Sequence, residues 1–401
     1  MFAARSGAAG FLARHHSAAL SAVAAFAGLA TAAATASVWY QSIVWLDVAA
    51  LALGAVLAAA IGYWHLRHLT LAILVAVTPL PGLLWAAPLS AGSSFGLVPV
   101  IAYAFGFALA TLYVQRLLDR LLRSRAGEAP WYATGVMLVL TAVLVPIWFH
   151  GTNSNAAVQA ASDLIGTSAS VLLLLPLSLP LLRFDEAFVA EANRARERRG
   201  RIFEWLGGAA IPRWGLSFTG IALVFLALGW FGAEAMLLRG WWQFALTAVL
   251  VCAALGAFAG GWREGLGLGL VLALVTVVAL WWRSYDPRLP FGAVAILEMT
   301  MLAGLLALAG ARQMRRWRAS GEPSDMVRRR ALEDSAGGVF ATLGATAAAM
   351  PSLIHAGAPV VVLSILAAGL CGALLFPAIL TALETLLPHR RSVEDVFHAG
   401  R

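Results

Sequence analysis

Glu298 is the residue of this sequence best suited to chemistry inside an apolar environment. It is flanked by Ile296, Leu297 and Met299 and lies inside an apolar run over 290–311. A charged carboxylate at the centre of a membrane helix costs on the order of 2.5–3.5 kcal/mol on insertion scales, so such a residue needs a reason to be there. We interpret Glu298 as a proton or cation site. The alternative is a neutral carboxyl group that hydrogen-bonds to a neighbouring helix.

Two threonines and two histidines are further candidates. Thr342 and Thr346 are one helical turn apart on one face of an apolar run, where their hydroxyl groups could hydrogen-bond to Glu298 or simply pack between helices. His150 and His355 each end an apolar run. Because histidine titrates near neutral pH, this pair is a candidate for pH sensing or substrate gating, and interfacial anchoring is the alternative.

Three more acids, Asp47, Asp163 and Glu234, lie near the ends of their apolar runs. From there they can reach interfacial water, so a solvated structural role is favoured for all three.

Motifs of soluble enzymes and metal centres are absent from the sequence. It has no glycine-rich phosphate loop ending in Lys, no serine elbow, and no Cys or His pair with metal-ligand spacing. Cys252 and Cys371 lie within apolar runs and are interpreted as small buried hydrophobic residues. We therefore expect no catalytic residue, no metal, no cofactor and no enzymatic activity.

The composition is that of a membrane protein. Hydrophobic residues make up 61% of the chain, charged residues 12%, and the mean hydropathy is +0.82. A soluble domain carries about twice this share of charge. The formal charge of +8 comes from arginines beside apolar runs. Contact with anionic membrane lipids explains them better than nucleic-acid binding, which we do not expect.

Twelve apolar runs are long enough to cross the hydrocarbon core, which takes roughly 20 residues of helix. Lipid forces each run to satisfy its backbone hydrogen bonds internally, so each is expected to be a helix. The runs cover 16–37, 43–64, 67–88, 95–117, 132–150, 158–182, 213–236, 241–260, 265–283, 290–311, 335–354 and 359–384. The sequence thus predicts an all-α integral membrane protein.

The arginines predict how these helices are threaded. All but Arg239, Arg283 and Arg288 lie in alternate connectors, which are expected to face the cytoplasm. This places the protein in the inner membrane of the cell as a multi-pass protein with both termini in the cytoplasm. The first run also resembles a secretory signal with a cleavage site near Ala36, but its length and the eleven runs after it favour a retained helix.

The chain is expected to contain two parallel six-helix pseudo-repeats. Runs in the second half begin about 200 residues after their counterparts in the first half. Residue types at matching ends also recur, since the fifth run ends at His150 and the eleventh at His355. An even number of spans per half gives both halves the same orientation. The expected units are a first repeat over 1–184, a cytoplasmic Arg-rich amphipathic linker over 185–212, a second repeat over 213–388 and a cytoplasmic tail over 389–401.

The end of the second repeat carries a family resemblance. An Arg-rich connector from Arg312 is followed by a run rich in Gly and Thr, and the last run contains Leu375, Phe376, Pro377, Ala378, Ile379 and Leu380. This stretch resembles the last part of resistance-nodulation-division (RND) exporters, particularly their MMPL branch, whose final helix ends near a Leu-Pro-Ala-Leu signature. The resemblance implies a twelve-helix membrane core in two halves.

Two departures from that family limit the comparison. RND exporters carry large extracytoplasmic porter domains after the first and seventh spans, where this sequence has only WYQS at 39–42 and LLRG at 237–240. They also use acids in the fourth and tenth helices to relay protons, and the equivalent positions here hold Ala108 and Gly304. The resemblance is therefore to a membrane core without the porter domains.

From these observations the sequence predicts a transporter or exporter that moves a lipid or another hydrophobic molecule, with proton coupling as a further possibility. Its expected partners are membrane lipids, a hydrophobic substrate and a protein that supplies extracytoplasmic domains. One alternative is a non-catalytic membrane subunit that docks with such a partner protein. A membrane-embedded lipid-modifying enzyme is the less favoured alternative, because no catalytic constellation is present.

Overall fold

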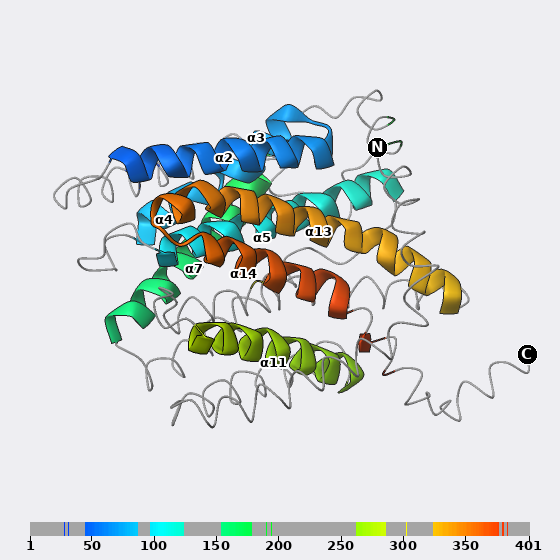
Figure 1. Ribbon diagram of the computed structural model, residues 1–401. Coiled ribbons are helices and arrows are strands. Elements are labelled where there is room, and N and C mark those ends of the chain that lie inside the picture. The colour runs from blue at the N-terminus through cyan, green and yellow to red at the C-terminus, as the bar shows by residue number, and fades with distance from the viewer. Residues whose placement is uncertain are drawn as a thin grey trace, which may run out of the picture.

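The computed structural model describes residues 45–86, 97–123, 154–178, 262–285 and 324–376, with the single residues Gly28, Thr31, Ala190, Arg194, Leu302, Ile379, Leu380 and Leu383. Those five segments contain helices and turns and no strand (Figure 1). The helices are α2 (Trp45–Leu66), α3 (Leu69–Val77), α4 (Leu80–Ala86), α5 (Leu97–Arg123), α7 (Ser154–Ser178), α11 (Trp262–Tyr285), α13 (Ser324–His355), α14 (Pro359–Leu370) and the π-helical turn η2 (Cys371–Leu375). The predicted helical class is confirmed for this part of the chain.

Several of these helices match the predicted spans. Three segments are long and apolar enough to cross a membrane: Leu46–Leu66, Leu69–Ala86 and Gly337–His355. Shorter apolar segments are Pro99–Gln115, Ser162–Leu175 and Pro359–Leu374. The runs 16–37, 132–150, 213–236, 241–260 and 290–311 lie outside the described residues except at single positions. The number twelve, the two-repeat plan and the domain boundaries therefore stay predictions.

Helices α2 and α13 pack against each other in antiparallel directions. Asp47 at the start of α2 pairs with His355 at the end of α13. Near the other end, the ring of His65 on α2 stacks on Phe340 of α13 with a centroid separation of 4.7 Å. In Figure 1 the two helices lie one above the other, followed below by α14 and α11.

The remaining contacts extend this alternation. A Cβ atom on Gly344 of α13 would meet Phe107 of α5, and one on Gly337 would meet Gln115, so α5 and α13 are antiparallel. By the same kind of evidence, α7 is antiparallel to the α3–α4 segment. Among the described spans, the second, fourth and sixth thus share one direction and the third and eleventh the other, as the arginine distribution predicts. Which side faces the cytoplasm stays a prediction.

Helix α5 forms the centre of the described bundle. Its residues from Pro99 to Val114 are all buried, and it contacts α2, α3, α4, α7 and α13. A helix buried on every side is apolar all round, and Ile101, Phe105 and Phe107 fill the interior. The periphery is apolar as well. Helix α2 exposes Leu53, which is expected of a surface that faces lipid.

Three features differ from the simplest helix predictions. The predicted span 67–88 is divided into α3 and α4. Helix α13 begins at Ser324, so the end of the Arg-rich connector continues the membrane helix instead of forming a separate surface element. The last span contains the π-helical turn η2 directly before Phe376 and Pro377. Proline removes a backbone donor from a helix, which explains a local change in hydrogen bonding there.

Candidate functional site

The break between α3 and α4 interrupts a membrane helix near its middle. The sequence there is Thr78-Pro79-Leu80-Pro81-Gly82, and neither proline has a backbone N–H to donate to the preceding turn. Helix α3 ends at Val77, and the chain turns with a 3.1 Å hydrogen bond from the N–H of Gly82 to the carbonyl of Pro79 before α4 continues. Breaks of this kind inside a membrane require other donors for the freed carbonyl groups.

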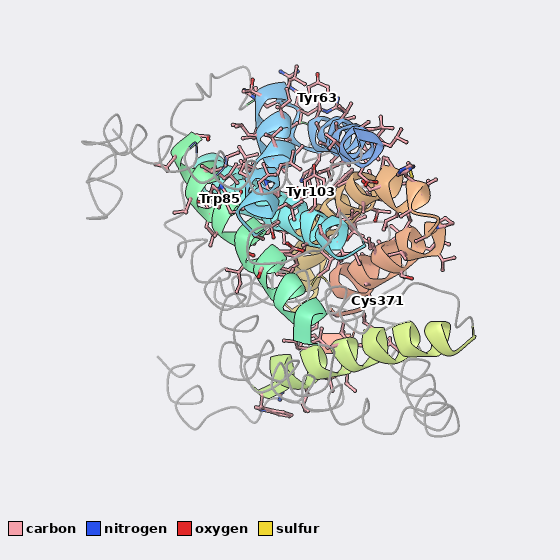
Figure 2. All side chains as sticks on the ribbon, turned by 90° about the vertical axis from the view of Figure 1, so that its left-hand side faces the viewer. Tyr63, Trp85, Tyr103 and Cys371 are labelled. Atoms are coloured by element: carbon pink, nitrogen blue, oxygen red, sulfur yellow. The ribbon has the colours of Figure 1, made fainter. Side chains whose placement is uncertain are left out.

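Hydroxyl groups from two neighbouring helices supply those donors. The Tyr103 hydroxyl of α5 donates to the carbonyl of Ala76 at 2.8 Å, and the Ser170 hydroxyl of α7 donates to the carbonyl of Thr78. Both side chains are buried. Figure 2 shows Tyr103 inside the bundle, while Tyr63 lies at its edge. Side chains of α5 and α7 therefore add to the backbone hydrogen bonds that remain at the break, from Thr78 to Leu74 and from Gly82 to Pro79.

Helix α7 turns a buried polar stripe toward this break, consisting of Asp163, Thr167 and Ser170. Their spacing of four and three residues places them on one face of the helix. Thr167 is fully buried, and its hydroxyl donates to the carbonyl groups of Asp163 (2.8 Å) and Leu164 (3.1 Å) in its own helix. Polar groups in this position are uncommon in a membrane core, and they are usually functional.

Two polar atoms of this region have no hydrogen-bond partner among the described residues. One is the hydroxyl oxygen of Thr78 and the other is Oδ2 of Asp163. The Asp163 residue is only 2% exposed. A buried polar group normally finds a partner, so an unpartnered one marks a place where a further ligand can bind.

The position of Asp163 corrects the sequence-based interpretation. The solvated structural role assumed that its span began at 158, whereas α7 begins at Ser154. Asp163 therefore lies about two and a half turns inside the helix. It is buried in the fold, where α7 packs against α4 and α5, and no local pattern reveals this. The signal that could have identified it is that Asp163 is the only charged residue of α7.

Two glycines, Gly82 and Gly166, allow α4 and α7 to approach closely beside this polar stripe. A Cβ atom added to Gly82 would meet the backbone of Gly166, and one added to Gly166 would meet the carbonyl oxygen of Gly82. A Cβ on Gly106 of α5 would lie 2.8 Å from Cβ of Pro79 and 3.1 Å from Cβ of Thr167. The break in the third span is thus packed backbone to backbone, with small residues at the contact points.

Thr342 and Thr346 lie on one face of α13 as predicted, and their hydroxyl groups donate hydrogen bonds to carbonyl groups of the same helix. Thr342 donates to the carbonyl of Gly338 and Thr346 to that of Thr342, both at 2.8 Å. Thr342 is fully buried, and a Cβ atom on Gly369 of α14 would meet it, so it packs between the two helices. Glu298 and His150 lie outside the described residues.

His355 pairs with Asp47 at the partly exposed end of the bundle where α2 begins. Its Nε2 lies 3.5 Å from Oδ1 of Asp47, and the two side chains are 42% and 31% exposed. This agrees with the solvated role predicted for Asp47. An exposed pair of this kind contributes about 0–1 kcal/mol to stability.

The described residues contain no cluster of His, Cys, Asp or Glu that could hold a metal ion. Cys371 is a free, half-buried thiol at the start of η2 (Figure 2), and Cys252 lies outside the described part. At the place where RND exporters carry an acid in the fourth helix, Ala108 is fully buried in α5. Gly304 is not among the described residues.

Comparison with known proteins shows the fold. No family model and no curated protein matches the chain. Among solved structures, the chain is similar to SecDF in the crystal structure of its super-membrane-facing form, with a TM-score of 0.61 and 11% sequence identity. The match covers 88% of this chain and 63% of the SecDF chain, so this chain spans less than two thirds of the length of that protein. The likeness shows that the chain shares the fold of the SecDF structure over most of its length.

Proposed function

We propose that this protein is the membrane core of an MMPL-like RND transporter that moves a lipid or another hydrophobic molecule through the inner membrane. The observation that carries the proposal is the similarity to SecDF over 88% of the chain at a TM-score of 0.61. The break between α3 and α4 supports it, because discontinuous membrane helices commonly surround the binding sites of transporters.

A hydrophobic substrate is supported by the small share of the chain that is expected outside the membrane. The expected non-cytoplasmic connectors are short, and the positions of the large porter domains hold only 39–42 and 237–240. A substrate that arrives from water would need a binding surface outside the bilayer. A lipid can reach the helices directly from the membrane, where peripheral helices such as α2 expose apolar side chains.

Proton coupling through Glu298 is the mechanistic part of the proposal. Glu298 lies within the predicted tenth span, which in this superfamily contributes to proton relay. His150 and His355 are proposed to gate the substrate path. Each is expected at the non-cytoplasmic end of its span. Both termini are proposed to lie in the cytoplasm.

Reconstitution tests the transport proposal. Proteoliposomes containing the purified chain are loaded with a fluorescent phospholipid in one leaflet, and an impermeant quencher reports its movement to the other leaflet under an imposed pH gradient. We expect faster movement than in empty vesicles, and loss of the gradient effect in Glu298→Gln but not in the control Glu333→Gln, which alters an acid of the sequence before the predicted eleventh span. Equal movement with and without protein, for this probe and for total lipid extracts of the host, contradicts the proposal. Unchanged coupling in Glu298→Gln removes Glu298 alone.

A partner-dependent subunit is the second candidate. It is favoured by the part of SecDF that this chain does not span, together with the missing porter domains. A subunit of this kind co-purifies with a stoichiometric partner after mild solubilisation and is inactive without it. Purification as a single active species contradicts this candidate.

A further inference from the structure

The buried acid on α7 has no structural reason to be where it is. Asp163 is 2% exposed, and its Oδ2 has no hydrogen-bond partner among the described residues. Acidic residues are almost never fully buried unless they are paired. A carboxylate without a partner in a low-dielectric interior either takes up a proton or binds a cation.

No positive side chain in the surrounding described helices pairs with this carboxyl group. Helix α7 packs against α3, α4 and α5. Helices α3 and α4 contain no titratable residue. On the part of α5 beside α7 the titratable group is Tyr103, and its hydroxyl is engaged with the carbonyl of Ala76. The charged residues of α5 begin at Arg116, which is roughly 20 Å farther along the helix at 1.5 Å per residue.

The same surroundings favour a proton over a metal cation. A metal ion needs several oxygen ligands around it, and the described residues hold no cluster of acids or histidines for one. A proton needs only the Asp163 carboxylate. The hydroxyl of Thr167, one turn farther along the same face, is committed as a donor to backbone carbonyls and can still accept a hydrogen bond.

We propose that Asp163 is an exchangeable-proton site. When the proton binds, one O–H bond forms on the carboxylate and one O–H bond of hydronium breaks. No other bond changes. The site lies in the sixth predicted span, whereas the family resemblance implies acids in the fourth and tenth. It stands apart from Glu298 and does not rest on the transport proposal, because it can be measured without a substrate.

Difference infrared spectroscopy of the full-length chain in lipid nanodiscs tests this directly. Titration with pH should give a carbonyl stretching band of a protonated carboxyl group that appears and disappears reversibly. The band should persist in Asp47→Asn, which alters an exposed carboxylate, and in Glu298→Gln, which separates the two proposed sites. The band that remains in Glu298→Gln should be lost when Asp163→Asn is added to that variant.

A band that is unchanged when Asp163→Asn is added to Glu298→Gln overturns the proposal, as does a band that responds to sodium at constant pH and not to pH itself. If Asp163→Asn does not fold, Asp163→Glu keeps the carboxyl group and should move the band without abolishing it. An unmoved band in Asp163→Glu also overturns the assignment.

Discussion

Replacing Gly166 with alanine tests whether α4 and α7 meet as closely as the fold indicates. The new Cβ atom would overlap the carbonyl oxygen of Gly82 and would lie 3.2 Å from its carbonyl carbon and 3.3 Å from Cβ of Ala86. Because the obstacle is backbone, no side-chain rotation relieves it, and the two helices must separate. Gly62→Ala is a matched control, since its Cβ atom would meet Ala72 at an ordinary contact distance of 3.4 Å.

The expected size of the effect follows from this comparison. Both changes replace glycine by alanine inside a helix, so both gain up to about 1 kcal/mol from helix propensity. Only Gly166→Ala adds overpacking, which typically costs about 1–3 kcal/mol. The difference in the free energy of unfolding between the two variants should therefore be about 1–3 kcal/mol, or roughly 5-fold to 150-fold in the folding equilibrium.

Reversible unfolding by sodium dodecyl sulfate, followed by tryptophan fluorescence in mixed micelles, measures this difference. Gly62→Ala should unfold at or above the detergent fraction of the unsubstituted protein, and Gly166→Ala clearly below it. Equal midpoints for the two variants would show that α4 and α7 are not in backbone contact, and the close packing of the broken helix would be refuted.

Three other predictions use the same preparations. Ser170→Ala removes the donor to a carbonyl freed by the helix break and should cost about 1–3 kcal/mol of unfolding free energy. Ser178→Ala should cost less, because the hydroxyl of Ser178 bonds only within α7. The reverse order would contradict the role of Ser170 as a donor to the broken helix. His355→Ala removes an exposed ion pair and should change stability by no more than about 1 kcal/mol, so a larger loss would mean that the pair holds α2 and α13 together. Accessibility tags in 152–155 and in 116–131 should report opposite sides of the membrane, and a shared compartment would refute the predicted threading.

Much of the helical plan could be predicted from the sequence because lipid imposes a simple rule. A run of about 20 apolar residues must be a helix, and α2 and α5 fall within a few residues of the predicted runs 43–64 and 95–117. The shared direction of α2 and α5, opposite to that of α13, agrees with the distribution of the arginines. The helical state of a run depends on the lipid around it, and its direction depends on which side of the membrane its arginines occupy. Both factors act on each segment separately.

The candidate site could not be predicted in the same way because it depends on packing between segments. The run 67–88 is apolar throughout, and Pro79 and Pro81 do not by themselves reveal which neighbours accept the broken backbone. The contribution of Ser170 becomes visible only when α7 lies beside the break. Asp163 was misjudged for a related reason, since its distance from the end of the apolar run was taken as its distance from water.

The polar features also distinguish the two predicted halves. If the third span pairs with the ninth, as the repeat predicts, then the broken α3–α4 segment corresponds to α11, which is a continuous helix from Trp262 to Tyr285. If the sixth pairs with the twelfth, with starts at 158 and 359, Asp163 corresponds to Ser364. The hydroxyl of Ser364 donates to the carbonyl of Val360 at 3.1 Å in its own helix.

On that predicted pairing, the second half satisfies locally, at these two places, what the first half leaves to neighbouring helices or, at Asp163 Oδ2, leaves without a partner among the described residues. A duplicated membrane core has no need for this difference in order to fold, because the satisfied version is present in the same chain. An unpaired carboxyl group and a broken helix both lower stability, by leaving polar groups without local partners. Their occurrence together around α7 is better explained by a function of that region than by the requirements of the fold.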